Sequence, residues 1–183
     1  MRHQVAICTH FAIDHYRGGE KWAVNLANKL SNEPNVSVDV YSLPYAPDGT
    51  RKVDAHDVLD SSIGYTEAWR HDLSSVDTAY VFYHPGAKIS FAGADTYIAG
   101  IHSWIYVSPY LWERHYGLVP TAVKLLYRAV GTHDLDRYDR VHSVTRAFTT
   151  NHPNSTVIPN FVDMNVFRPE RVPLNENFTV AVT

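Results

Sequence analysis

The chain has 183 residues, of which 45% are hydrophobic and 19% are charged, and its formal net charge is −3. This composition is ordinary for a globular protein that folds without a metal or a disulfide, and the acidic balance argues against a general nucleic-acid binder. The single cysteine, Cys8, excludes an internal disulfide, and its apolar neighbours predict a buried structural thiol rather than a nucleophile.

The first forty residues predict a strand, a helix and a second strand. An unbroken apolar run at 4–11 is typical of a strand buried on both faces. Two glycines and a helical pattern follow, and Pro34 ends the helix before a second strand at 36–43. Such a unit favours neighbouring parallel strands.

The rest of the chain continues this alternation. We predict further strands at 77–84, 96–103, 139–145 and 155–160. Helical patterns occupy 65–73, 104–116 and 119–135, whereas 84–95 is predicted to be a loop, and 52–60 a short strand or the start of a helix. The order predicts an α/β fold: a Rossmann-like, doubly wound, mostly parallel sheet with helices on both faces.

The tail predicts a domain boundary. Residues 1–170 form the expected domain, 171–177 are polar and contain a proline, and 178–183 are apolar like a strand. We therefore expect 171–183 to be a linker and the first strand of an absent second domain. The apolar run at the N-terminus is too short for a signal peptide, and no segment approaches the roughly 20 apolar residues of a membrane span, so we expect a cytoplasmic protein.

The glycine pair Gly18–Gly19 opens the first helix. A helix N-terminus presents unpaired N–H groups, and glycine lets a phosphate or sugar approach them and also permits positive φ. Glu20 lies in the first turn, where the helix dipole favours a negative charge. A tight turn that packs the helix closely on the sheet explains the same pair. The dinucleotide and P-loop glycine motifs are absent, which argues against a standard NAD or ATP site.

Four segments, in the same order along the chain, resemble family 4 glycosyltransferases. They are GGEKWAVNLANKL (18–30), GIHSW (100–104), YDRVHSVT (138–145) and VIPNFVDMNVFRPE (157–170). The last is the most specific, although Phe161 stands where the family usually has glycine. The resemblance implies one half of the two-domain GT-B architecture, the N-terminal, acceptor-side domain. The missing C-terminal domain would then hold most contacts with a nucleotide sugar.

The resemblance also implies roles for particular residues. His102 would contact the transferred sugar or stabilise charge, and Gly18, Gly19 and Glu20 would form the donor phosphate and sugar loop. The acceptor side would include His84, Ser103, Arg146 and His10. Histidines hydrogen-bonded at strand ends and a surface salt bridge of the arginine explain these residues as well. Five further histidines are predicted to lie on the surface: His3, His56, His71, His133 and His152.

No metal site and no cofactor is expected. His10, His84 and His102 show no close pairing with a carboxylate, and the family as a whole generally needs no metal for the nucleotide. The aromatic segment 104–116 suits core packing, or else a half-wet lip for a lipid-linked or sugar acceptor at the inner face of a membrane.

The sequence thus predicts the N-terminal domain of a retaining glycosyltransferase that transfers a sugar from a nucleotide sugar to an acceptor hydroxyl. Its expected partners are the nucleotide sugar, the acceptor and the second domain, without nucleic acid. The fragment alone should fold without turnover. Two alternatives stay open: a non-catalytic sugar- or nucleotide-binding module, including a partner subunit of a split transferase, and a nicotinamide-dependent oxidoreductase.

Overall fold

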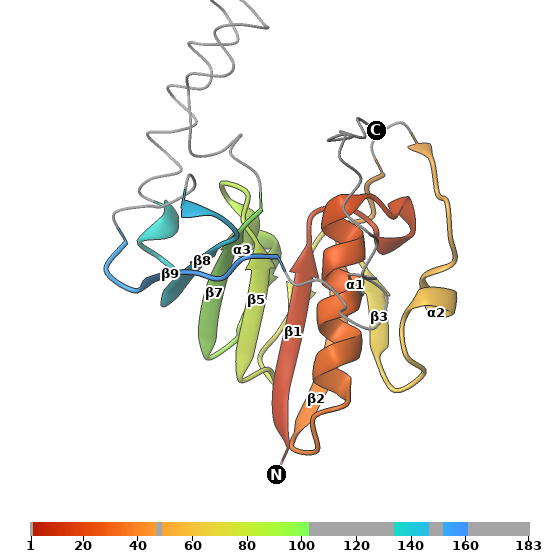
Figure 1. Ribbon diagram of the computed structural model, residues 1–183, viewed down its shortest axis with the longest axis horizontal. Helices are drawn as coiled ribbons and strands as arrows, with labels where there is room; N and C mark the ends of the chain where they lie inside the picture. The colour runs from red at the N-terminus through yellow and green to blue at the C-terminus, as the bar shows by residue number, and fades with distance from the viewer. Residues whose placement is uncertain (1, 47–48, 103–133, 147–151, 161–183) are drawn as a thin grey trace, which may run out of the picture.

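The structure is a computed structural model that describes residues 2–46, 49–102, 134–146 and 152–160. Its main sheet consists of β1 (His3–Thr9), β2 (Val36–Ser42), β3 (Gly64–Glu67), β5 (Thr78–Phe82), β7 (Thr96–Ile101), β8 (Arg140–Ser143) and β9 (Ser155–Val157). These seven strands lie in the order β3-β2-β1-β5-β7-β8-β9, and each neighbouring pair is parallel (Figure 1). This is the predicted α/β, Rossmann-like sheet.

Four helices whose full extent is described and a small second sheet accompany the main sheet. The helices are η1 (Ile13–His15), α1 (Gly18–Ser31), α2 (Ala55–Val58) and α3 (Ala87–Ser90). The second sheet pairs β4 (His71–Asp72) with β6 (Phe91–Ala92). The long helix α1 crosses one face of the main sheet beside β1 and β2, and its N-terminal end lies toward the carboxyl end of β1 (Figure 1).

The core is divided by the sheet into two clusters, because successive side chains of a strand point to opposite faces. On β1, Ala6 and Cys8 belong to one cluster, whereas Ile7 belongs to the other. The cluster around Ile7 contains the buried face of α1, including Ala23 and Val24. The opposite cluster contains residues of α3, the small sheet and the segment at 135–138. Both faces of the sheet are therefore covered, as predicted.

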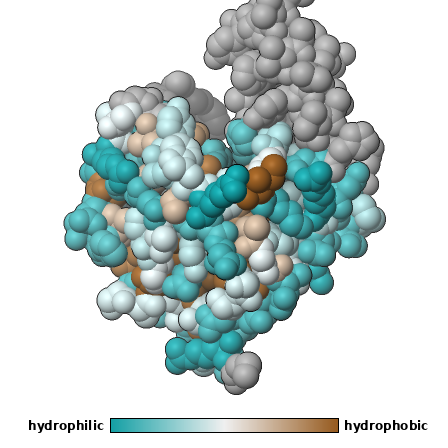
Figure 2. Space-filling view, turned by 180° about the vertical axis from the view of Figure 1, so that it is seen from behind, coloured by the Kyte–Doolittle hydropathy of each residue, from teal (hydrophilic) through white to brown (hydrophobic). Residues whose placement is uncertain are grey.

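The buried Cys8 confirms the expectation of a structural thiol, and burial raises its pKa. The surface opposite α1 is a mixture of hydrophilic residues with scattered apolar ones (Figure 2). The large apolar side chains with more than half of their surface exposed are isolated in the sequence: Trp69 (65%), Ile89 (64%) and Ile158 (56%).

The predicted helix at 65–73 is wrong. Residues 64–67 form β3, which pairs with β2 at the edge of the sheet, and 71–72 form β4. Pairing of the aromatic and β-branched residues Tyr65 and Thr66 with an existing strand outweighs the helix propensity of the residues that follow. The predicted loop at 84–95 likewise contains α3 and β6, and the ambiguous segment at 52–60 contains α2.

His71 is buried rather than on the surface, which corrects a second expectation. Its Nε2 lies 3.0 Å from the carbonyl oxygen of Ser42, and its ring stacks on Phe91 at 5.2 Å between centroids. His3 and His56 are exposed, as predicted. His152 is partly buried, with Nε2 at 3.0 Å from the carbonyl oxygen of Tyr138.

Several expectations fall outside the described residues. These are the helical segment at 104–116, most of that at 119–135, His133, Ser103, and the boundary between 1–170 and 171–183. Within the described part of the chain, no helix combines the length and apolar character that a membrane crossing requires.

Candidate functional site

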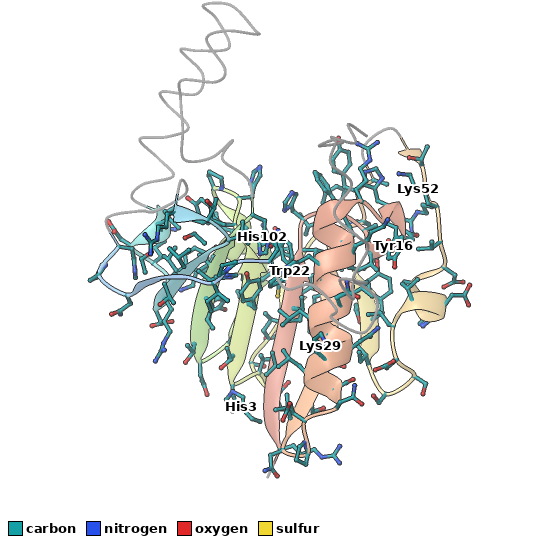
Figure 3. The ribbon with its side chains drawn as sticks, in the orientation of Figure 1. His3, Tyr16, Trp22, Lys29, Lys52 and His102 are labelled. Atoms are coloured by element: carbon teal, nitrogen blue, oxygen red, sulfur yellow. The ribbon has the colours of Figure 1, made fainter. Side chains whose placement is uncertain are left out.

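The strand order reverses between β1 and β5, and a cavity of about 560 Å³ lies beside the carboxyl ends of the neighbouring strands. In doubly wound sheets this crevice is where ligands bind. We call it the switch-point cavity, and besides the residues predicted from sequence its lining comprises Phe11, His15, Arg17, Trp22, Phe82 and Asn160. Trp22 of α1 and His102 after β7 lie next to each other there (Figure 3). His3, at the start of β1, lies far away at the opposite end of the strands.

Five of the predicted site residues meet at this cavity: Gly18, Gly19, Glu20, His10 and His102. His84 and Arg146 are not part of its lining. The His84 ring nevertheless lies 5.7 Å from the His10 ring, and its Nδ1 lies 2.8 Å from the carbonyl oxygen of Pro85. Arg146 is exposed after β8.

The glycine pair is not required by packing. A Cβ at Gly18 would meet no atom within 4 Å, and a Cβ at Gly19 would lie 3.8 Å from Cε1 of Phe82, an ordinary contact. Neither glycine has a positive φ, so the expected use of left-handed backbone is absent here. The tight-packing explanation therefore loses its support, while the open space beside the first two helical N–H groups remains.

Glu20 is buried and caps its own helix. Its Oε2 accepts a hydrogen bond of 2.9 Å from the backbone N–H of Arg17, the residue that precedes α1. A carboxylate at this position satisfies one of the donors that a helix start leaves open. It also places a negative charge at the edge of the switch-point cavity, which opposes a bound anion and favours hydroxyl groups as donors.

His102 is enclosed by aromatic rings. It stacks on Phe82 at 4.4 Å between centroids, and Trp22 meets it edge-on at 4.3 Å. Removal from water disfavours the charged imidazolium, and nearby His142 adds to the effect. Together they lower the pKa of His102 from 6.5 to about 3. The imidazole at the cavity is therefore neutral at physiological pH.

A buried tyrosine connects two histidines beneath the cavity. The Oη of Tyr80 lies 2.7 Å from Nε2 of His102 and 2.5 Å from Nδ1 of His142. His142 in turn places Nε2 at 2.9 Å from the carbonyl oxygen of Ile158. Sequence reasoning missed Tyr80 and His142 because both lie inside apolar strands, where aromatic residues predict core packing. The motif YDRVHSVT, which contains His142, was the one available indication.

His10 is a second neutral histidine at the cavity. Desolvation, together with His84, lowers its pKa from 6.5 to about 4, although a hydrogen bond with the backbone of Phe82 opposes the shift. Its Nδ1 is buried and has no hydrogen-bond partner among the described residues. The ring packs edge-on against Phe11 at 4.1 Å.

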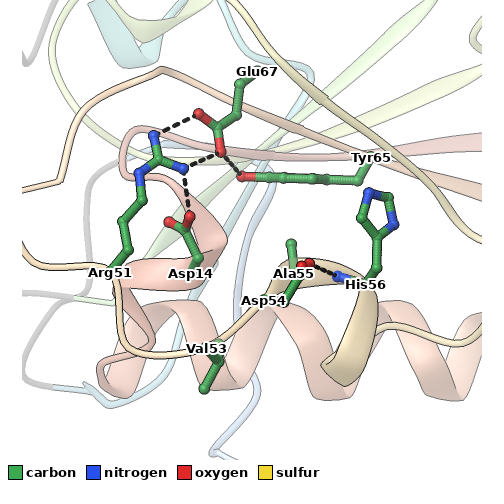
Figure 4. A pocket seen from close by; sticks show the side chains of 8 residues that line it. All are labelled: Asp14, Arg51, Val53, Asp54, Ala55, His56, Tyr65 and Glu67. Carbon is green, nitrogen blue, oxygen red and sulfur yellow. Dashed lines mark hydrogen bonds and ion pairs between the residues drawn. The ribbon is translucent and has the colours of Figure 1, made fainter.

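A separate cavity of about 430 Å³ has Arg51 in its lining (Figure 4). Arg51 donates two hydrogen bonds to Glu67, of 2.9 and 3.0 Å, and a third to Oδ2 of Asp14. Glu67 also accepts a hydrogen bond of 2.7 Å from the Tyr65 hydroxyl. The guanidinium is the first cause of a lowered pKa at Glu67. This arrangement ties the loop before α2 to η1 and to the edge strand β3.

Among the described residues, no group of three or more His, Cys, Asp or Glu is arranged to hold a metal ion. The sequence matches no protein-family model and no curated protein. The fold and its cavity define the class: an α/β protein with a Rossmann-like parallel sheet and an aromatic, histidine-containing crevice at the reversal of strand order.

Proposed function

We propose that the chain is the N-terminal, acceptor-side domain of a retaining glycosyltransferase similar to family 4. It would transfer a sugar from a nucleotide sugar to an acceptor hydroxyl, such as that of a glycan, a lipid-linked sugar or a small molecule. The single observation that carries this proposal is the open glycine pair Gly18–Gly19, which faces a crevice that also holds the neutral His102.

The polar groups of the crevice suit the sugar part of the donor better than its diphosphate. The first N–H groups of α1 are hydrogen-bond donors, whereas the Glu20 carboxylate and the His102 imidazole supply acceptors. A sugar hydroxyl both donates and accepts, so it matches this set. The charge of Glu20 weakens the helix N-terminus as an anion site, which agrees with a diphosphate held mainly by a second domain.

A non-catalytic sugar-binding module, or a partner subunit of a split transferase, is the second candidate. The observation in its favour is the low pKa of His102, about 3, which makes this histidine a weak base. In the described lining of the crevice, Glu20 is the one carboxylate, and it is already engaged in capping. Retaining transfer by the enzyme would then depend on groups of the donor and of the second domain.

The test is a donor screen on the complete gene product. Nucleoside diphosphate sugars with different bases and sugars are supplied with simple acceptors, and turnover is measured by nucleotide release. We expect one donor to support release, and we expect Gly19→Val to lower turnover by at least about tenfold, because its branched side chain fills the approach to the helix start.

Ala92→Val, on the exposed side of β6, is the matched control and should leave turnover unchanged. Equal circular dichroism and melting temperature of the variants separate loss of binding from loss of fold. Donor binding without any release would favour the module instead. If no nucleotide sugar binds or reacts, the proposal fails.

A further inference from the structure

The hydrogen bonds beneath the switch-point cavity form a chain whose last acceptor is the backbone carbonyl oxygen of Ile158, and this acceptor sets the donor at every earlier step. The N–H of Ile158 donates to the carbonyl oxygen of Ser143 at 3.0 Å, which fixes the local backbone beside β8. The carbonyl oxygen of Ile158 can only accept a hydrogen bond, so the Nε2 of His142, at 2.9 Å, must be the donor. A neutral His142 then carries its proton on Nε2, and its Nδ1 is an acceptor.

Tyr80 has a single hydroxyl proton, so it can donate a hydrogen bond to only one of the two histidines that it contacts. That proton goes to Nδ1 of His142 at 2.5 Å, since this nitrogen has none of its own. The hydroxyl oxygen is left to accept a hydrogen bond from Nε2 of His102 at 2.7 Å. Burial raises the pKa of Tyr80 well above 10, so the hydroxyl keeps its proton.

We propose that Tyr80 and His142 are positioning residues that fix the proton of His102 on Nε2, so that its Nδ1 can only accept a hydrogen bond and the cavity selects a ligand hydroxyl at that point. A carbonyl or carboxylate oxygen has no proton to donate, and it is disfavoured there. The proposal concerns the described chain itself; it rests on the proposed function only for the identification of the hydroxyl as that of a sugar.

The surroundings of His102 leave Nδ1 for a ligand. Its contacts within the described chain are the hydrogen bond to Tyr80 and the rings that enclose it, chiefly Phe82 and Trp22. These rings offer no acceptor for a hydrogen bond in the plane of the imidazole, and they hold its orientation. His102 also lines the cavity, as do Trp22 and Phe82. The imidazole is thus oriented before any ligand arrives.

Nitrogen NMR of histidine-labelled protein tests the proposal without any substrate. The two ring nitrogens of a neutral histidine have well-separated shifts according to which one carries the proton. We expect the protein to show His102 and His142 both protonated at Nε2, with the His102 proton exchanging slowly because Tyr80 accepts it. His102→Gln assigns the signal. A His102 that carries its proton on Nδ1 overturns the proposal.

Two variants ask whether the constraint passes through Tyr80. In Tyr80→Phe the Nε2 proton of His102 loses its acceptor and should exchange rapidly with water. In His142→Leu the Tyr80 hydroxyl is free to donate to His102, so the form protonated at Nδ1 should become detectable. Tyr97→Phe, a tyrosine of β7 whose hydroxyl instead accepts from the N–H of Ala94, is the control and should change neither signal.

If Tyr80→Phe does not fold, the wild-type spectrum and His142→Leu still decide. A His102 signal that is identical in wild type and His142→Leu contradicts a relay through Tyr80.

The ligand part of the proposal has its own probes, glucose and acetate, because glucose donates from hydroxyls whereas acetate only accepts. We expect glucose to shift the Nδ1 resonance of His102 and acetate to leave it in place. The reverse result, or no shift with glucose, overturns the hydroxyl selection. A failed donor screen combined with the expected tautomer would reject the proposed function and leave the positioning role standing.

Discussion

Gly100 of β7 provides the space that the Tyr80 side chain of β5 occupies. A Cβ at position 100 would overlap the Tyr80 hydroxyl and would lie 2.6 Å from its ring carbon Cε1. Gly100 is paired with Phe82 on one side and with His142 on the other. The Tyr80 side chain therefore crosses over β7, which lies between β5 and β8, to reach His142. Gly100 permits this crossing because it has no side chain.

We expect Gly100→Ala to destabilise the protein by about 1–3 kcal/mol, as overpacking of a core does. The Tyr80 ring cannot yield easily, since Trp22 stacks on it at 5.5 Å and its hydroxyl is held by two histidines. Urea unfolding gives the free energy. Gly18→Ala is the control, because the same substitution there meets no atom within 4 Å. Equal stability of Gly100→Ala and the wild type would contradict the packing described.

Gly18→Ala should stabilise the fold by about 0.4–1 kcal/mol, because alanine reduces the conformational freedom of the unfolded chain. The position is helical, lacks a positive φ, and has no atom within 4 Å of the added Cβ. Thermal and urea unfolding measure the effect. The matched contrast is Gly86→Ala, which should destabilise because Gly86 has a φ of 82°. A clear loss of stability in Gly18→Ala would restore the packing explanation of the pair.

The free energy of unfolding should fall as the pH falls below about 6.5. The fold lowers the pKa of His102 from 6.5 to about 3 and that of His10 from 6.5 to about 4. The unfolded chain binds more protons in this window, so the stability held by each neutral histidine is complete above the window and lost as the pH descends through it. Each contributes a slope of up to about 1.4 kcal/mol per pH unit.

Unfolding curves at several pH values between about 7 and 4.5 measure this slope. His102→Gln should lessen it, because glutamine does not titrate and His10 alone of the two then contributes. His56→Gln is the control, since His56 is exposed, and it should keep the wild-type slope. A stability that stays level across the window in the wild type would show that these histidines are not held neutral by the fold.

Arg51→Met should lower stability at neutral pH by about 1–2 kcal/mol, since it leaves the buried Asp14 carboxylate without its cation. Part of the loss concerns Glu67, whose pKa Arg51 lowers. That contribution is present above the ordinary carboxyl pKa and disappears as the pH falls through the lowered value. The difference between variant and wild type should therefore shrink in acid. Arg70→Met, an exposed arginine after β3, serves as the control.

Cys8 should resist thiol reagents in the folded protein. It is fully buried in β1, and desolvation raises its pKa, so neither access nor thiolate is available. Labelling followed by mass spectrometry should track global unfolding as urea is added. Labelling of native protein at the rate of a free thiol would place Cys8 at the surface and contradict the core arrangement.

The strands and the long helix could be predicted from the sequence because their information is local. The pattern from Gly18 to Leu30 has the period of an amphipathic helix, whereas the runs at 4–11 and 77–84 are short, apolar and continuous, as strands buried on both faces are. The short strands β3, β4 and β6 could not be predicted in this way. The pairs β3 with β2 and β4 with β6 exist because a distant strand supplies their partners, and no local pattern records that partner.

The candidate site, too, could be predicted only in part from the sequence. The rule that ligands lie at the carboxyl ends of parallel strands was sufficient to select Gly18, Gly19 and His102, and these residues share one cavity. The rule also selected His84 and Arg146, which follow β5 and β8 of the same sheet but do not line that cavity. Proximity to a strand end is a property of the sequence, whereas lining one cavity depends on where each loop turns.

The sequence by itself determined the alternation of strands and helices and the two-faced burial of the sheet, and it predicted the end of the strands at which a ligand would bind. Only the tertiary structure decided that Tyr80, His102 and His142 touch. Tyr80 lies on β5, His142 lies on β8, and His102 directly follows β7. Their hydrogen bonds therefore depend on strand order, register and the missing side chain of Gly100. The local sequence pattern predicts which residues are buried, but the direction of a hydrogen bond depends on partners that meet only in the folded chain.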